Sequence, residues 1–540
     1  MRFAPALALA LLTGCDAVAG IHAASERTEP GVEAAGSAST PPAGATCATH
    51  ADCLTGASAE FDPYACIEGA CVRLMSDECQ LLLPSSNQWL QNLRSGDADP
   101  LIFGIFTIYD QHLDADDTRN FDLALTDVTE KVIGIPAVND KRRPLVGVAC
   151  NSGTLTSPLS EDQLDRAMDH LTLDLGVTGI LSDLQASDLE RAFRYRGYDR
   201  HVFFMNALGA EENVQTLMSD GLIWSILPPG TDLVPVYQPL VDRAVAHLRS
   251  NGTLGATENA RVAIVIAQNV PVLNDIGSAV VNTLSINGKA ATDQNAGGDF
   301  LEITVFSPSG EGAPSVDTDA ILQLKAFKPH IVVSATGDEF LKDYIPLIEE
   351  ANPPLAPMYV LSEWDYGQTD ALASLVTSSK LALHERLIGV NYAEAPEQHA
   401  DQAYQLHFDA KYAPQSNASG LENFYDAAYY FFYSAAASGM AWPLQGHDMV
   451  NGMRRLLSGN DPFDVGPDDL ERAVVELETP DASITLNGTM GPPNFSSDGV
   501  RHTPGSVYCI DQNGDRRSDV LTLDGDGKLT SEEPFPCFDF

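Results

Sequence analysis

The sequence predicts an α/β protein with two doubly wound α/β/α lobes, preceded by a small disulfide-rich module. From about residue 101, apolar runs of strand length alternate with amphipathic helical patterns, as is typical of parallel sheets buried on both faces. This alternation breaks off at 251–259 and then starts again, which favours two lobes over one large sheet. Four cysteines cluster ahead of the first strand, in a segment too short to bury a core of its own.

The first 15 residues have the pattern of an export signal that ends at a cysteine. Arg2 precedes a run of about ten mostly apolar residues, which is too short to span a membrane as a stable helix. The ending Leu-Thr-Gly-Cys at 12–15 resembles the lipobox of bacterial lipoproteins, and this resemblance implies that Cys15 is lipidated. The alternative is an ordinary signal peptide with a chance cysteine. We therefore expect a lipid-anchored protein of the cell envelope, on its periplasmic or cell-surface side.

The chain is strongly acidic. Its 540 residues include 31 Lys and Arg against 75 Asp and Glu, which gives a net charge of −44. Such a surface repels nucleic acid and anionic headgroups, so nucleic-acid binding is not expected. Two interpretations stay open: the charge keeps an exported protein soluble, or it favours cationic ligands or Ca²⁺.

Residues 16–45 are rich in Ala, Gly, Ser, Thr and Pro, and they predict a flexible stalk. The Cys-rich module follows at 46–79. Eight cysteines remain after Cys15, and an even number in an exported chain indicates four disulfides. The four clustered cysteines allow three connectivities, of which we favour the interleaved one. The expected pairs are Cys47–Cys66, Cys53–Cys71, Cys79–Cys150 and Cys509–Cys537.

The first set of strand–helix units runs from about 98 to 250. A capping box formed by Ser160 and Gln163 starts a helix whose apolar residues recur at helical spacing as far as Gly176. The expected strands are 101–108, 144–149, 177–181 and 201–205.

The second set runs from 251 to 394 and has a helix expected at 272–286. Its expected strands are 261–267, 301–306, 330–335, 358–361 and 387–391. Helices then dominate 397–477, including 424–438 and 447–457, and the Gly- and Asp-rich stretch 484–540 is expected to form short strands.

Several segments in this order resemble the type I periplasmic-binding-protein family, whose nearest members in pattern are leucine/isoleucine/valine-binding proteins. They are the strand that ends at Tyr109-Asp110, the strand Arg143–Cys150, the strand from Arg261, the helix start Phe424–Tyr429, and Asn487–Gly491 with Phe495 and Gly499. The resemblance implies two lobes with hinge crossovers over 80–510. We place lobe 1 at about 98–250 and 395–480, lobe 2 at about 251–394 and 481–510, and a disulfide-stapled tail at 511–540.

In that family a ligand binds between the lobes, where loops follow the carboxyl ends of the strands. Ser187 is expected either to cap its helix or to donate to a ligand, and Trp364 to offer a platform for an apolar or cationic ligand. The chain departs from the family at Asn206–Gly209 and at Pro271, so an α-amino acid ligand is in doubt. The resemblance implies ligand contacts at Tyr109, Asp110, Gln185, Ser187, Asn206, Leu208, Asn269, Asp338, Trp364 and Tyr425.

The segment 511–519 places oxygen-bearing side chains at alternating positions. Asp511, Asn513, Asp515 and Asp519 follow the spacing of Ca²⁺ loops, in which such side chains converge on one hard cation. Arg516, however, stands where these loops usually have Gly. The alternative is that the Asp-Gly pairs of this region are hairpin turns.

No catalytic motif of the nucleotide-binding, zinc-protease or serine-hydrolase kind occurs, and Asp116-Asp117 is explained by a helix start, so we expect no enzyme. The leading hypothesis is a membrane-anchored solute-binding lipoprotein. It would bind an amino-acid-like or other polar solute for ABC-type uptake or sensing, with a membrane permease or envelope protein as partner. The alternative is a cell-envelope scaffold or interaction protein with a degenerate cleft.

Overall fold

We describe the fold from a computed structural model of the chain. Within the described residues, none of the helices has the length and apolar character needed to cross a membrane. The expected lipidation site Cys15 and the expected stalk up to residue 42 lie outside the described residues. The structure describes residues 43–537 apart from 55–61, 86, 95–97, 109–115, 155–156, 210–213, 215–216, 218, 295–297, 308–315, 351–355, 367–368, 379–382, 394–398, 414–420, 525 and 532–534.

Lobe 1 contains a six-stranded sheet in the order β12-β11-β10-β4-β7-β3. The first five strands of this order are parallel, and the edge strand β3 is antiparallel to β7. The four strands expected from the sequence are present, whereas the edge strands β3 and β12 were not predicted, because three residues carry too little periodicity. The bounds are β3 Leu81–Leu83, β4 Leu101–Thr107, β7 Leu145–Asn151, β10 Gly179–Ser182, β11 Phe203–Asn206 and β12 Ile223–Ser225.

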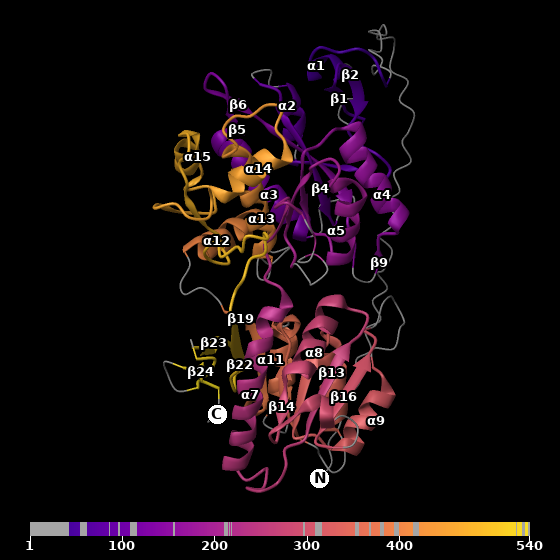
Figure 1. The fold of residues 1–540 in the computed structure, drawn as a ribbon, viewed down its shortest axis with the longest axis vertical. Coiled ribbons are helices and arrows are strands. Elements are labelled where there is room, and N and C mark those ends of the chain that lie inside the picture. Colours follow the sequence, from indigo (N-terminus) through magenta and orange to yellow (C-terminus); the bar gives the residue numbers. More distant parts are fainter. Residues whose placement is uncertain are drawn as a thin grey trace, which may run out of the picture. The chain divides into compact units, whose positions relative to one another are not determined.

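Helices lie on both faces of this sheet (Figure 1). The predicted capping box is formed at the start of α4, where the Gln163 backbone N–H donates to the Ser160 hydroxyl. The helices are α2 Gln88–Arg94, α3 Asp116–Val132, α4 Glu161–Asp169 with the π-turn His170–Asp174, α5 Ala186–Ala192 with the π-turn Phe193–Gly197, α12 His399–Tyr412, α13 Glu422–Ala436, α14 Gly446–Arg454 and α15 Leu470–Glu478. Short strand pairs complete the lobe: β5 Ile135–Ala137 with β6 Lys141–Arg143, β8 Gly153–Thr154 with β9 Ser157–Pro158, and β20 Pro462–Asp464 with β21 Thr485–Asn487.

Lobe 2 contains an eight-stranded sheet in the order β16-β13-β17-β18-β19-β22-β23-β24. The first five strands are parallel and the last three are added antiparallel. The stretch we expected to be a separate tail therefore continues this sheet, because β23 pairs with β22. The bounds are β13 Val262–Ala267, β16 Phe300–Val305, β17 Ile331–Ala335, β18 Met358–Leu361, β19 Leu387–Tyr392, β22 Gly505–Ile510, β23 Arg516–Leu523 and β24 Leu529–Thr530.

Helices also cover both faces of the second sheet, so each lobe is a three-layer α/β/α unit (Figure 1). The helices are α7 Val234–Ser250, α8 Pro271–Thr283, α9 Thr318–Phe327, α10 Ile345–Glu349 and α11 Thr369–Ser378. Shorter turns are η3 Gly230–Leu233, η4 Ala291–Gln294, η5 Phe340–Tyr344, η6 Glu363–Asp365 and η7 Leu383–Glu385, and β14 Ser285–Ile286 pairs with β15 Lys289–Ala290.

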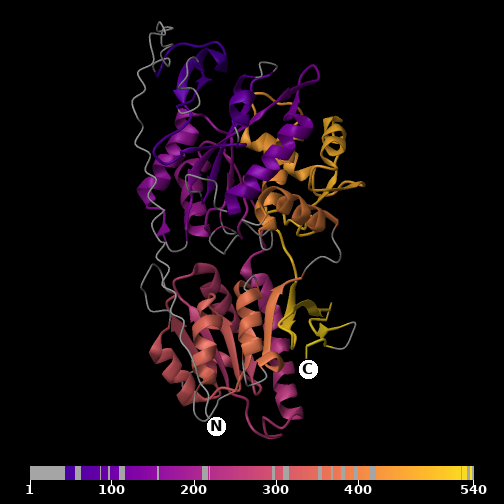
Figure 2. The same cartoon turned by 180° about the vertical axis from the view of Figure 1, so that it is seen from behind.

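The lobe boundaries differ from the predicted ones in two places. Helix α7, which we assigned to lobe 1, packs its apolar face into the core of lobe 2. Ile484, Leu486 and Val500, which we assigned to lobe 2, are buried in the core of lobe 1. Figure 2 shows by colour that the orange helices α12–α15, as expected from the sequence, lie beside the early, purple elements of lobe 1. A crossover has no sequence signal of its own, so the first crossing was assigned too late in the chain and the last one too early.

The Cys-rich module consists of the one-turn helix α1 His50–Cys53 and the hairpin β1 Tyr64–Ile67 with β2 Ala70–Arg73. Two interleaved disulfides, Cys47–Cys66 and Cys53–Cys71, close it in the connectivity favoured from the sequence. The other two expected pairs, Cys79–Cys150 and Cys509–Cys537, are also formed.

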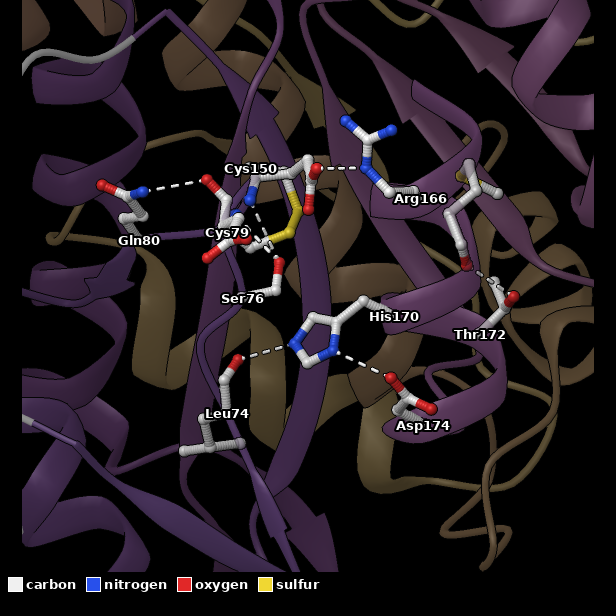
Figure 3. The surroundings of a disulfide bond; sticks show 12 residues. Leu74, Ser76, Cys79, Gln80, Cys150, Arg166, His170, Thr172 and Asp174 are labelled. Carbon is white, nitrogen blue, oxygen red and sulfur yellow. Dashed lines mark hydrogen bonds and ion pairs between the residues drawn. A yellow bond between two sulfur atoms is a disulfide. The ribbon is translucent and has the colours of Figure 1, made fainter. Parts of the chain in front are cut away.

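The module is fastened to lobe 1 by the buried Cys79–Cys150 disulfide (Figure 3). Beside it, the Nε2 of His170 contacts the carbonyl oxygen of Leu74 at 3.0 Å, and its Nδ1 contacts the Asp174 carboxylate at 3.2 Å. The chain that leaves the module is therefore held against the sheet by one covalent bond and by a histidine of the helix that follows β7.

Candidate ligand-binding site

The chain passes between the two lobes three times, and the three passages are hydrogen-bonded to one another. The first leaves β12, the second leaves β19, and the third leads into β22. The Ser225 backbone N–H donates to the Gly499 carbonyl oxygen at 2.9 Å, and the Arg501 N–H donates to the Ser225 carbonyl oxygen at 3.3 Å. These bonds join the first passage to the third.

The second passage is joined to both of the others. The Tyr392 hydroxyl donates to the Pro228 carbonyl oxygen at 3.0 Å, and the Ala393 N–H donates to the Pro504 carbonyl oxygen at 2.8 Å. Ser225 ends β12 and Tyr392 ends β19, so the passages leave both parallel sheets at their carboxyl ends. In open α/β sheets, ligands bind outside those ends.

At the carboxyl end of the lobe 2 sheet, turn η6 holds two buried carboxylates. Ser362 is the N-cap of this turn, and its backbone N–H donates to the Asp365 carboxylate at 3.2 Å. The other Asp365 oxygen and both Glu363 oxygens are buried without a hydrogen-bond partner among the described residues. Burial raises the pKa of Glu363 to about 7 and that of Asp365 well above its ordinary value.

The Tyr237 hydroxyl, from the first turn of α7, faces the same group. Tyr237 is 1% exposed, and its hydroxyl has no partner in the part of the chain that the structure describes. Burial and then the Glu363 and Asp365 charges raise the pKa of this hydroxyl. Tyr508 of β22 closes the other side, where its hydroxyl donates to the Ser362 carbonyl oxygen at 3.1 Å.

At the carboxyl end of the lobe 1 sheet, Asp183 follows directly after β10. One of its oxygens accepts from the Ile108 backbone N–H at 3.0 Å, and the other is buried without a partner among the described residues. Burial and then the nearby Asp117 raise the pKa of Asp183 to about 8, and burial and the adjacent Asp116 raise that of Asp117 to about 6. Asp117 is therefore more than the solvated helix-start residue that the sequence indicated.

Some residues expected to contact a ligand are occupied by the protein itself. Asn206 is fully buried, and its amide accepts from the Ser182 hydroxyl at 2.7 Å and donates to the Leu184 and Leu208 carbonyl oxygens. Tyr425 is fully buried in the lobe 1 core, where its hydroxyl donates to Asp127 at 2.8 Å. The ligand role of Tyr425 was wrong, because this position of α13 faces α3 and not the sheet edge.

Other expected residues lie at the edges with varied partners. Asn269 exchanges hydrogen bonds with the Ser307 backbone, and Asp338 pairs with Lys342 one helical turn later. Leu208 is partly buried against the lobe 1 core. Trp364 is half-buried and packs on Val270 and neighbouring apolar residues at the end of β13.

Two expectations at α5 concern Gln185 and Ser187. Gln185 is the N-cap of α5, and Ser187 is an exposed residue inside the helix, so the expected capping role of Ser187 was wrong. The chain enters the helix two residues earlier than the serine suggested. Tyr109 and Asp110 lie outside the described residues.

Sequence reasoning missed Asp183 and Tyr237, and it placed Glu363 and Asp365 in an expected cleft loop without giving either carboxylate a role. The available signal was position: each acidic residue follows within four residues of a buried parallel strand, with no basic residue beside it. Tyr237 had no such signal, because it reaches the edge from a helix assigned to the other lobe.

The expected calcium loop is closed by hydrogen bonds of its own. One Asp511 oxygen accepts from the Asn513 and Asp515 backbone N–H groups at 2.9 and 3.0 Å, and the other accepts from the Arg517 guanidinium at 2.8 Å. Asp519 follows with a positive φ of 49°. Among the described residues, the one group of three close metal-ligating side chains is Cys47, Cys53 and Cys71, whose sulfurs form disulfides.

Three surface hollows lie away from the carboxyl edges. One of about 550 Å³ lies between α7 and the β14–β15 hairpin. The others, of about 490 and 390 Å³, lie between the Cys-rich module and lobe 1, and both are lined by His50 and Asp99. Arg143 lines the larger of these two, and its guanidinium stacks on Trp442, which lines the smaller.

The architecture is the two-lobed α/β arrangement of type I periplasmic binding folds. No family model matches the sequence, and no curated protein matches it. Solved structures similar to the chain include a solute-binding protein of an ABC transporter from R. palustris in complex with benzoate, with 12% identity over 81% of this chain and 99% of that one, and a TM-score of 0.49.

Two further similar structures are a substrate-binding protein of a branched-chain amino acid transporter and a leucine-binding protein. LivJ from Streptococcus pneumoniae, in complex with isoleucine, has 10% identity over 79% of this chain and 100% of that one. The leucine-binding protein LivK from Thermotoga maritima has 13% identity over 79% of this chain and 99% of that one. Both TM-scores are 0.49. At these identities the likeness concerns the fold and not the ligand.

Proposed function

We propose that this chain is an extracytoplasmic solute-binding lipoprotein, anchored through Cys15, that closes its two lobes on a small molecule. The observation that supports this function most strongly is the hydrogen-bonded set of three passages at the carboxyl ends of both sheets. Two rigid lobes joined there can open and close about a hinge, as in two-lobed binding proteins. Opening and closing of the lobes about a solute would serve uptake through a membrane permease as well as sensing.

Buried polar atoms that lack hydrogen-bond partners among the described residues, at the carboxyl ends of both sheets, also support the proposal. Asp183 in lobe 1 and Glu363 in lobe 2 keep buried carboxylate oxygens without partners among the described residues. Proteins rarely leave such atoms unpaired, because each costs free energy comparable to a lost hydrogen bond. A solute held between the edges would supply the missing partners.

The test is a thermal-shift screen of the purified full chain against amino acids, sugars, nucleobases, aromatic acids and amines. A solute at 100 times its Kd should raise the free energy of unfolding by about 2.7 kcal/mol. A Cys15→Ser variant should lose membrane partitioning while keeping the same solute response. If no class of compound shifts the melting temperature, the solute-binding function is wrong.

A scaffold role is the second candidate, because Asn206 and Tyr425, expected ligand contacts, are committed to the protein. The scaffold role predicts an envelope protein that co-purifies stably with the chain, together with no solute response in the screen.

A further inference from the structure

The buried acidic groups at the two edges have no basic partner. Within the described residues, no Lys, Arg or His side chain forms an ion pair with Asp183, Glu363 or Asp365. The Arg516 guanidinium of lobe 2 is stacked on the Tyr366 ring, 3.6 Å from its centroid. Burying an ionised carboxylate without a countercharge is costly to the stability of the fold. We infer that the acidic groups at the two edges are retained because they serve a function.

The lobe 2 group has the donors and acceptors of a cation site. Among the described residues, Glu363 and Asp365 offer three unpartnered carboxylate oxygens, and the hydroxyl of Tyr237, 1% exposed, is likewise buried without a partner. The phenol is donor and acceptor at once, so it can donate to one carboxylate while accepting from a protonated nitrogen.

Trp364 lies between the two acidic residues in the sequence of η6 and is half-buried against Val270. An indole beside a desolvated carboxylate pair is a favourable place for an organic cation, because the ring face attracts positive charge. A neutral sugar or an aliphatic side chain would use the ring but leave the carboxylates unpaired.

The lobe 1 edge has the same sign of charge. Asp183 at this edge is 5% exposed, and Asp117 lies near it. Once Asp183 is ionised, a ligand carboxylate placed against it would be repelled in a region of low dielectric constant. When their carboxyl groups are ionised, both edges therefore favour a positively charged ligand over an acid.

On the basis of the proposed solute-binding function, we propose that the ligand is an organic amine that carries a protonated nitrogen and no carboxylate, held by Glu363, Asp365 and Tyr237 of lobe 2 and by Asp183 of lobe 1. A bare metal ion fits less well, because the described carboxylates do not converge as three close ligands at either edge.

The experiment is isothermal titration calorimetry of the full chain with putrescine, phenethylamine, 1,4-butanediol, L-leucine, benzoate and CaCl₂. We expect one of the two cations to bind and the diol, which matches putrescine in shape without its charge, to bind at least about tenfold more weakly, since a charge-assisted hydrogen bond contributes about 1.5–3 kcal/mol. Glu363→Gln and Asp183→Asn should each weaken cation binding by about tenfold or more.

Glu385→Gln is the matched control, because it removes one acidic charge from an exposed side chain of lobe 2 before β19. It should leave cation binding unchanged, and the melting curve of each variant shows that it is folded. Binding of leucine, benzoate or Ca²⁺ without binding of either cation would overturn the inference while leaving solute binding intact. No binding by any compound of the wider screen would overturn both.

Discussion

The Asp232 carboxylate on η3 contacts the imidazole of His502, which lies 270 residues away in the chain, with its oxygens 3.1 Å from Nδ1. One of the same oxygens accepts from the Thr503 backbone N–H at 3.2 Å. Asp232 belongs to the first passage between the lobes, and the other two residues belong to the third. The Asp232 carboxylate therefore links the first passage to the third through side-chain hydrogen bonds, in addition to the backbone hydrogen bonds that join the passages.

Asp232→Ala should loosen the hinge. Removing an acceptor of two hydrogen bonds is expected to lower the free energy of unfolding by about 1 kcal/mol. Hydrogen exchange should quicken in residues 226–233 and 499–505, and chemical denaturation measures the stability. Asp242→Ala, at an exposed position of α7, is the control and should change neither. Equal exchange in the two variants would show that Asp232 does not restrain the hinge.

The stability of lobe 1 should depend on the protonation of His407. The hydrogen bond to Asp127, 2.7 Å long, holds the pKa of His407 above its usual 6.5. A raised histidine pKa stabilises the fold fully below pH 6.5, and this contribution is lost as the pH rises through the folded-state pKa. His407→Gln should therefore cost more stability at pH 5.5 than at pH 8.5, by up to about 1 kcal/mol because the side chain is partly exposed.

Urea denaturation at the two pH values measures this difference. His399→Gln, on the same helix with a side chain that is 81% exposed, is the control and should give nearly equal effects at both. A cost for His407→Gln that does not change with pH would mean that the imidazole binds Asp127 in its neutral form.

The strand–helix alternation could be predicted from the sequence because parallel strands buried on both faces are continuous apolar runs. β4, β13 and β18 each fall within one residue of the predicted ends. The disulfides followed from cysteine number and chain context. By contrast, β12 has only three residues, which is too short for a recognisable periodicity. Helix α7 follows directly after a crossover, and its periodicity does not indicate which lobe it packs against.

The candidate site was predicted by place but not by residue. The loops after the strands were identified from the sequence. In the structure, however, Asn206 is a buried amide with partners inside the fold, whereas Asp183 keeps a carboxylate oxygen without a partner among the described residues. The difference depends on whether a polar side chain finds a partner inside the fold, which only the three-dimensional contacts decide. Tyr237 illustrates the same limit, since the charge of Glu363, 126 residues away in the sequence, raises the pKa of its hydroxyl.

Asp183→Asn should stabilise the protein while weakening solute binding. The folded-state pKa of Asp183 is about 8, whereas an unfolded aspartate titrates near pH 4, so the fold bears a penalty that grows as the pH rises from about 4 to 8. Asparagine removes the charge and can still accept from the Ile108 N–H. We expect a gain of about 1–4 kcal/mol at pH 8 and almost none at pH 4.

Thermal denaturation across that pH range provides the measurement, with exposed Asp199→Asn as the control. A stability gain together with lost affinity is the signature of a residue kept for binding at a cost to the fold. If Asp183→Asn destabilises the protein at pH 8, the carboxylate is a structural group and not a ligand contact.

The two long-range disulfides should differ in their contributions. Cys79–Cys150 closes 71 residues and Cys509–Cys537 closes 28, which in the chain-entropy model stabilise by about 4.4 and about 3.6 kcal/mol. Replacing both cysteines of each pair with alanine should therefore cost more for the first pair, which is also fully buried. Guanidinium denaturation without reductant ranks the two double variants, and a reversed order would contradict the loop-length account.

Gly389→Ala should disturb turn η6 at the carboxyl end of the lobe 2 sheet by displacing the Tyr508 ring. A Cβ at Gly389 would lie 2.1 Å from the Tyr508 ring on the neighbouring strand β22, far inside contact distance. The ring must then move, and its hydroxyl would lose the bond to the Ser362 carbonyl that steadies η6. Overpacking of this kind costs about 1–3 kcal/mol.

The same change should reach the solute site, because η6 presents Glu363 and Asp365. We expect Gly389→Ala to lower the melting temperature, to alter Trp364 fluorescence and to weaken solute binding together. Gly255→Ala, where a new Cβ meets an exposed Glu258 side chain that can move away, should change none of the three. Lost stability with unchanged solute affinity would show that solute binding does not depend on the Tyr508 support of η6.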